Sequence, residues 1–144
     1  MQPEIGFFLA ARTIAVVGVS RGRGFGNTAL RTLRDRGWTC YPVNARADEV
    51  AGERCFRRLE DLPARPDAVL AVVPPAEAVR VVEDCVRLGV KSVWLQQGAE
   101  SPAAVRRAEA AGLAVVAGRC ALMYARPRGI HRFHRWLAAL AGKP

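Results

Sequence analysis

The feature that most constrains the fold of this chain is residues 13–30, where an apolar run, a glycine-rich turn and a helical pattern follow one another. Residues 13–17 (TIAVV) are β-branched or small and lack polar alternation, which predicts a strand buried on both faces of a parallel sheet. Asn27 is the predicted N-cap of the helix that follows. The turn between strand and helix contains four glycines, Gly18, Gly22, Gly24 and Gly26. Bare backbone N–H groups and a helix N-terminus both favour negative charge, so the stretch predicts a phosphate-binding loop.

Two alternatives for this turn stay open. Residues 18–22 (GVSRG) satisfy the G-x-S-x-G pattern of a hydrolase nucleophile elbow, although more glycine precedes the helix than an elbow requires. A tight turn that binds nothing is the other alternative. The dinucleotide pattern G-x-G-x-x-G is broken, because Ser20 stands third from Gly18 and Asn27 stands sixth from Gly22. We favour the phosphate loop.

A repeated order of helix, glycine and strand predicts the fold class. Glycine ends a helical pattern before each of the runs 38–43, 90–95 and 113–117, and a further buried strand is expected at 68–73. The pattern predicts an α/β protein: a Rossmann-like, doubly wound sheet of about five parallel strands with helices on both faces. We expect one domain over residues 1–144, with its core at about 10–121 and a C-terminal helix at about 129–142.

The composition narrows the function classes. The formal net charge of +9 favours an acidic ligand or partner. The basic residues are spread along the chain without interleaved aromatic residues, so we favour a solvated basic surface over nucleic-acid binding. We expect no membrane association and a cytoplasmic location. His131 and His134 lie three residues apart on the C-terminal helix and could share a ligand, but no third ligand stands nearby in the sequence, so we expect no metal site and a packed or hydrogen-bonded His134. The four cysteines form no CxxC pair and are predicted to be reduced, mostly buried thiols: Cys40, Cys55, Cys85 and Cys120.

In a doubly wound sheet the ligand lies beyond the carboxyl ends of the strands, where the strand order reverses, which we expect between the first and fourth strands. An NAD site needs an acidic residue after the second strand, but this chain has Asn44-Ala45-Arg46 there. Arginine instead suits a phosphate on the ribose. NADP carries such a phosphate at the 2′ position and coenzyme A carries it at the 3′ position.

Several of these segments together resemble the CoA-binding domain family, whose stand-alone members are similar to the N-terminal domain of the succinyl-CoA synthetase alpha subunit. The resemblance spans about residues 10–121, and its most specific parts are Val93-Trp94-Leu95-Gln96-Gln97-Gly98 and Arg119-Cys120. It implies that the protein binds CoA or an acyl-CoA, with the pyrophosphate on the glycine loop, the 3′-phosphate near Arg46 and the pantetheine arm near Gln96. The implied binding residues are Gly18, Val19, Ser20, Arg21, Gly26, Asn27, Asn44, Arg46, Val73, Pro74, Gln96, Gln97, Gly98 and Cys120.

The resemblance also bears on catalysis and partners. Related acyl-CoA ligases use a phosphorylated histidine in a further domain, so we expect this chain to have no independent catalytic activity and to act as a CoA-binding or regulatory protein. The alternatives are an NADP-dependent reductase and an accessory subunit of an NDP-forming acyl-CoA ligase, and a homodimer is a further option. Stand-alone members often carry an aromatic residue and an arginine before Pro74, where this chain has valines. Cys120 is expected to be a packed thiol, with a reactive thiol facing the CoA sulfur as the alternative.

Overall fold

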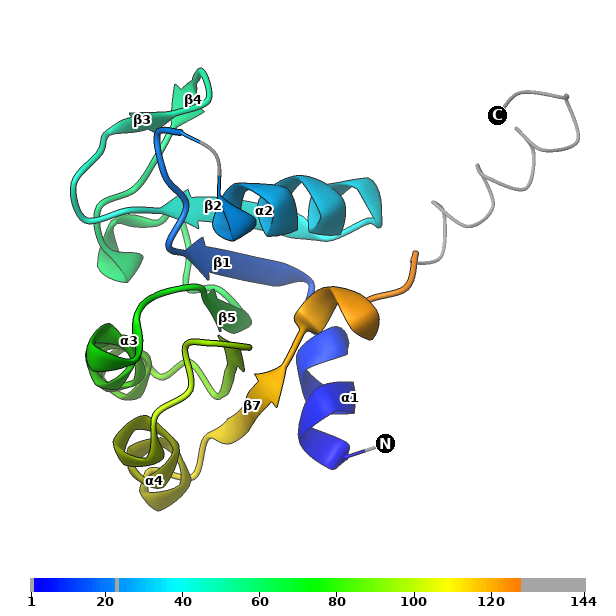
Figure 1. Cartoon of the computed structure of the whole chain (residues 1–144), viewed down its shortest axis with the longest axis vertical. Helices are drawn as coiled ribbons and strands as arrows, with labels where there is room; N and C mark the ends of the chain where they lie inside the picture. The colour runs from blue at the N-terminus through cyan, green and yellow to red at the C-terminus, as the bar shows by residue number, and fades with distance from the viewer. Residues whose placement is uncertain (1, 23, 128–144) are drawn as a thin grey trace, which may run out of the picture.

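Five parallel strands form the centre of the molecule in a computed structural model that describes residues 2–22 and 24–127 (Figure 1). Each strand coincides with one of the apolar runs predicted from the sequence, so the fold class is confirmed. The strands are β1 (Thr13–Val17), β2 (Thr39–Val43), β5 (Ala68–Ala71), β6 (Ser92–Gln96) and β7 (Ala114–Arg119), and they lie in the order β2-β1-β5-β6-β7.

The expected position of the reversal in strand order was wrong. The order reverses between β1 and β5, which are the first and third long strands along the chain, and not between the first and the fourth. The chain leaves β2, forms the small antiparallel pair β3 (Glu49–Val50) and β4 (Glu53–Arg54) and a 3-10 turn at Leu59–Asp61, and then enters the sheet on the other side of β1. The switch-point crevice therefore lies between the carboxyl ends of β1 and β5.

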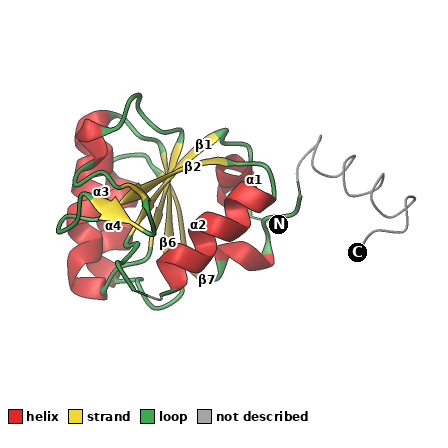
Figure 2. Cartoon of the chain, turned by 90° about the horizontal axis from the view of Figure 1, so that it is seen from above, coloured by secondary structure: helices red, strands yellow, loops and turns green. Residues whose placement is uncertain are grey.

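Helices cover both faces of the sheet, as predicted (Figure 2). The helices α1 (Pro3–Leu9) and α2 (Phe25–Asp35) pack with Ile14, Val16 and Trp94 in one buried cluster. The helices α3 (Pro75–Leu88) and α4 (Pro102–Ala110) pack on the opposite face. Alternate residues of the buried strands thus serve two separate apolar layers, which explains why these strands lack polar alternation.

Glycine ends three of the helices in the left-handed conformation. Gly37, Gly89 and Gly112 have φ values of 109°, 78° and 78°, and each stands between a helix and the next strand. This confirms the helix, glycine and strand order. Three cysteines are buried and Cys120 is half-buried, as expected. Across residues 2–22 and 24–127, no helix has the length and apolarity needed to cross a bilayer. The predicted C-terminal helix, with His131 and His134, lies outside the described residues.

Candidate functional site

Two glycines allow the turn after β1 to pack closely on the structure around it. Gly18 has φ 111°, and a Cβ at this position would lie 1.9 Å from the carbonyl oxygen of Val72, just beyond β5. A Cβ on Gly26, in the first turn of α2, would lie 2.4 Å from the carbonyl oxygen of Gly18. Only residues without a side chain fit at both positions. The N-terminus of α2 is thereby brought against the end of β1, beside the switch point.

Asn27 shapes the same loop, although not as the predicted helix cap. Helix α2 begins two residues earlier, with Gly24 at the N-cap position, so the capping prediction was wrong. From inside the first turn, the Asn27 side chain accepts a hydrogen bond from the Ser20 N–H (2.8 Å) and donates to the carbonyls of Ser20 and Gly22 (2.9 Å each). Three hydrogen bonds therefore hold the loop, and among the described residues no side chain caps the N-terminus of α2. Uncapped N–H groups there favour an anion.

The carboxyl end of β2 is joined to this loop through Asn44. Its side-chain amide donates to the Val19 carbonyl (2.7 Å) and accepts from the Arg46 N–H (2.7 Å). Arg21 reaches over from the loop and donates to the Arg46 carbonyl at 3.0 Å. The structure thus brings together the predicted residues that follow β1 and β2. The Arg46 side chain is exposed and forms no ion pair within the described part of the chain.

The predicted residues after β5, β6 and β7 line the same edge of the sheet. Val73 is half-buried and Pro74 is the exposed N-cap residue of α3, while Gln97 and Gly98 are exposed beyond β6. Gln96 is only 4% exposed, and its side-chain oxygen accepts a hydrogen bond from the Ala121 N–H (3.0 Å). Gln96 therefore holds the chain after β7 in place, and its contact with a pantetheine arm stays a prediction.

The most specific motif of the sequence, around Trp94, is mainly structural. Trp94 is fully buried, packs edge-on against Phe8 with ring centroids 5.1 Å apart, and donates its indole N–H to the Arg119 carbonyl (2.8 Å). The same carbonyl accepts from the Gln97 N–H at 3.2 Å. Trp94 and Arg119 thus fix the ends of β6 and β7 relative to each other, beside half-buried Cys120.

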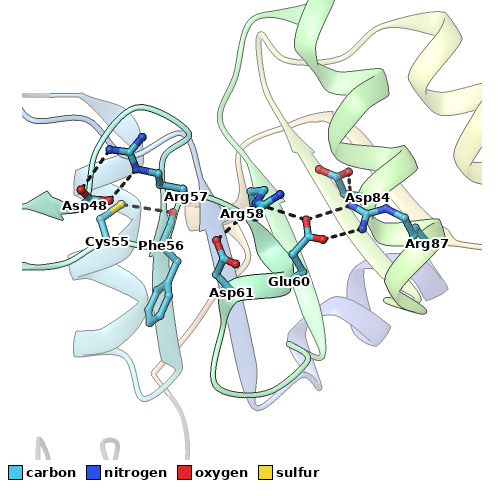
Figure 3. A network of polar contacts seen from close by, with 9 residues as sticks. All are labelled: Asp48, Cys55, Phe56, Arg57, Arg58, Glu60, Asp61, Asp84 and Arg87. Atoms are coloured by element: carbon cyan, nitrogen blue, oxygen red, sulfur yellow. Dashed lines mark hydrogen bonds and ion pairs between the residues drawn. The ribbon is translucent and has the colours of Figure 1, made fainter.

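Sequence reasoning missed a group of charged side chains at and just after the β3-β4 hairpin, which lines a hollow of about 480 Å³. Arg57 forms a two-point ion pair with Asp48 (2.7 and 3.2 Å), and Arg54 lies 4.9 Å over the Phe56 ring (Figure 3 shows the first pair). The hydrogen bond from Arg57 lowers the pKa of Asp48, and the charges of Arg57, Arg21 and Arg54 lower it further. Arg21 from the glycine loop and Arg54 from the hairpin therefore both act on the Asp48 carboxylate. The parallel bridge between Val43 and Phe56 and the hydrogen bonds beside it hold the hairpin against the end of β2, and no local sequence pattern predicts these contacts.

A family model described as the CoA binding domain matches residues 12–126, and the chain belongs to this family. A hypothetical protein from Pyrococcus horikoshii has the same fold, with a TM-score of 0.78 and 32% identity over 84% of this chain and 87% of that chain. The chain is also 29% identical, over 61% of its length, to an ADP-forming acetate–CoA ligase from Methanocaldococcus jannaschii.

The ligase relatives are much larger than the matched region. The match spans 13% of the Methanocaldococcus jannaschii ligase. The dinucleotide forming acetyl-coenzyme A synthetase 1 of Ca. Korarchaeum cryptofilum, solved with phosphate and ADP, is similar with a TM-score of 0.63 and 33% identity over 72% of this chain and 25% of that chain. The chain therefore corresponds to one part of such enzymes, and these two enzymes form acetyl-CoA, so the likeness to the succinyl-CoA synthetase alpha subunit stays a prediction.

Proposed function

We propose that this protein binds coenzyme A or an acyl-CoA at the carboxyl edge of the sheet, with the pyrophosphate on residues 18–27 and the 3′-phosphate near Arg46. The observation that carries the proposal is the contact of Gly18 with Val72 and of Gly26 with Gly18. These contacts place a bare backbone loop and an uncapped helix N-terminus beside the switch point, where both attract a phosphate.

The arrangement around Asn44 favours CoA over NAD. A ribose diol needs a free carboxylate after the second strand. Here the Asn44 side chain is occupied by Val19 and Arg46, and the exposed group at this position is the guanidinium of Arg46. Arg21 and Arg46 add positive charge where a ribose phosphate would lie, and guanidinium groups suit phosphate oxygens. Membership of the CoA-binding domain family supports CoA over the remaining alternative, NADP.

We further propose that the protein has no catalytic step of its own and binds CoA as a regulatory or accessory component. The ligase relatives contain this domain as a fraction of their length, which is compatible with a separate ligase partner. We also propose that the protein is similar to the N-terminal domain of the succinyl-CoA synthetase alpha subunit.

The test is a thermal-shift comparison of CoA, dephospho-CoA, NADP and NAD at equal concentration. A ligand at about 100 times its Kd stabilises the folded state by about 2.7 kcal/mol, which raises the Tm of a domain of this size by several degrees. We expect CoA to give a larger shift than dephospho-CoA and NAD to give none. Arg46→Ala should reduce the CoA shift to that of dephospho-CoA. Arg106→Ala, an exposed arginine on α4, is the matched control and should leave all shifts unchanged.

A larger thermal shift with NADP than with CoA would refute the CoA proposal and favour an NADP-dependent reductase. Equal loss of the CoA shift in Arg46→Ala and Arg106→Ala would show that Arg46 has no specific role. Binding of CoA with an unchanged preference over dephospho-CoA in Arg46→Ala would leave CoA binding intact and refute only the placement of the 3′-phosphate.

A further inference from the structure

A second hollow, of about 460 Å³, lies at the amino ends of β1, β5 and β6, on the opposite edge of the sheet from the candidate CoA loop. Its rim carries three cations from three different segments: Arg12 before β1, Arg65 before β5 and Lys91 before β6. All three residues are exposed, and none of them forms an ion pair with another described residue.

One carboxylate, that of Asp67, also lines the hollow, and its hydrogen bonds go to the backbone at the start of β1. Asp67 accepts hydrogen bonds at one oxygen from the backbone N–H groups of Arg12 (2.9 Å) and Thr13 (3.2 Å). The Arg12 N–H is the main cause of the lowered pKa of Asp67, which keeps the carboxylate charged. Asp67 thus secures the entry to β1 and offsets only one of the three positive charges. The hollow keeps a positive excess that a negative partner would neutralise.

The guanidinium of Arg65 has a defined place at the rim. Its Nη1 lies 3.0 Å from the position that a Cβ on Gly89 would occupy, and Gly89 ends α3 with φ 78°. The carbonyl end of a helix favours a cation. Arg65 therefore lies beside the C-terminus of α3 and lines the hollow.

An exposed aromatic ring completes the rim. Helix α1 is anchored through Ile5 and Phe8, which are 2% and 0% exposed, whereas Phe7 lies on the other side of the helix and is 53% exposed. Phe7 lines the hollow. A large apolar side chain next to unpaired cations is a combination that protein interfaces use.

We propose that this hollow is the docking site for an acidic segment of another protein, with carboxylates facing Arg12, Arg65 and Lys91 and an apolar side chain against Phe7. Charge complementarity argues against the chain itself as the occupant. The protein carries a formal net charge of +9, and residues 128–144 contain Arg128, Arg132, Arg135 and Lys143 but no Asp or Glu. An acidic partner therefore fits better than a second copy or this segment. The proposal does not depend on CoA binding.

Fluorescence anisotropy of the full chain with a labelled peptide of about 12 Asp and Glu residues around one leucine tests the proposal at about 0.1 M salt. We expect the double variant Arg65→Glu/Lys91→Glu to weaken binding about tenfold, since two exposed charge contacts are lost and both are replaced by repulsion. Arg80→Glu/Arg106→Glu makes the same change in net charge at exposed positions of α3 and α4, and should leave the affinity within about twofold. Phe7→Ser should weaken the peptide with leucine but not an all-acidic peptide.

Three results would overturn the proposal. The first is that the wild-type chain binds neither the peptide with leucine nor the all-acidic peptide. Equal weakening by the two double variants would show only a non-specific attraction to a basic protein. A single-stranded oligonucleotide of equal charge that binds more tightly than the peptide, with the same dependence on Arg65 and Lys91, would assign the hollow to nucleic acid. The Tm of each variant, followed by circular dichroism without any ligand, serves as the folding control, because it should stay close to that of the wild type at these exposed positions.

Discussion

Gly26→Ala sets two physical effects of opposite sign against each other. Gly26 lies inside α2, where alanine has a higher helix propensity than glycine by about 1 kcal/mol. The new methyl group, however, would lie 2.4 Å from the carbonyl oxygen of Gly18 and 2.8 Å from its carbonyl carbon. Both are backbone atoms, so no side-chain rotation relieves the contact and α2 must move away from β1.

The steric effect should dominate. Overpacking of a well-packed site costs about 1–3 kcal/mol, and a contact with backbone belongs at the upper end of this range. Subtracting the gain in propensity leaves a net loss of about 2 kcal/mol in the free energy of unfolding. At about 3 °C for each kcal/mol in a domain of this size, the Tm should fall by about 6 °C.

Thermal unfolding followed by circular dichroism measures this difference, and Gly22→Ala is the matched control. A Cβ on Gly22 would meet no atom within 4 Å, so its stability should stay within about 0.5 kcal/mol of the wild type. A Tm for Gly26→Ala at or above that of the wild type would refute the reasoning, because helix propensity alone predicts that outcome. That result would also contradict the close approach of α2 to β1, on which the proposed phosphate site depends.

Three further predictions concern other parts of the molecule. Ser101 caps α4 through a hydrogen bond of 3.0 Å, so Ser101→Ala should cost about 1 kcal/mol in thermal unfolding, and an unchanged Tm would contradict the cap. The hydrogen bond from Arg34 lowers the pKa of Glu53 below its ordinary value of 4.5, so this partly exposed pair stabilises the fold above pH 4.5 and the stabilisation is lost as the pH falls through the lower native pKa. Urea melts should show wild type more stable than Glu53→Gln by about 0.5 kcal/mol near neutral pH, with the difference vanishing in acid; a difference independent of pH would refute it. Ellman's reagent at about pH 8 should label Cys120 first, and the fast phase of labelling should be missing in Cys120→Ser. The other three thiols should react slowly, because burial raises the pKa of Cys40 and Cys85 to about 12 and also raises the pKa of Cys55.

Much of the fold was predictable because its signals are local. A strand with two buried faces needs an unbroken apolar run, and residues 13–17 and 68–71 have one. Three of the helices end at a left-handed residue before the next strand, a conformation that glycine adopts without steric cost, as at Gly37 and Gly89. These requirements act on a few consecutive residues, so they leave a pattern in the sequence.

The site was predictable only in part. The loop after β1 and the position of Arg46 after β2 follow from the same local patterns, and the structure brings them together through Asn44. The capping role predicted for Asn27 was wrong, because α2 begins at Phe25 and the Asn27 amide instead forms three hydrogen bonds with Ser20 and Gly22 of the preceding loop. The ligand contact of Gln96 stays a prediction, whereas its hydrogen bond with Ala121, which follows β7, joins two segments far apart in the sequence and was not predicted.

The sequence by itself determined which segments become strands, helices and turns, and that the loop after the first strand is rich in glycine, so that its backbone N–H groups are not covered by side chains. Only the tertiary structure decided that β5, and not β6, lies beside β1, because strand order depends on how the connection from β2 packs and not on any strand's own composition. The tertiary structure also decided which charges share a surface. Arg21 and Arg54, far apart in the sequence, both act on the Asp48 carboxylate, and Arg12, Arg65 and Lys91 meet at the opposite edge because parallel strands align their amino ends.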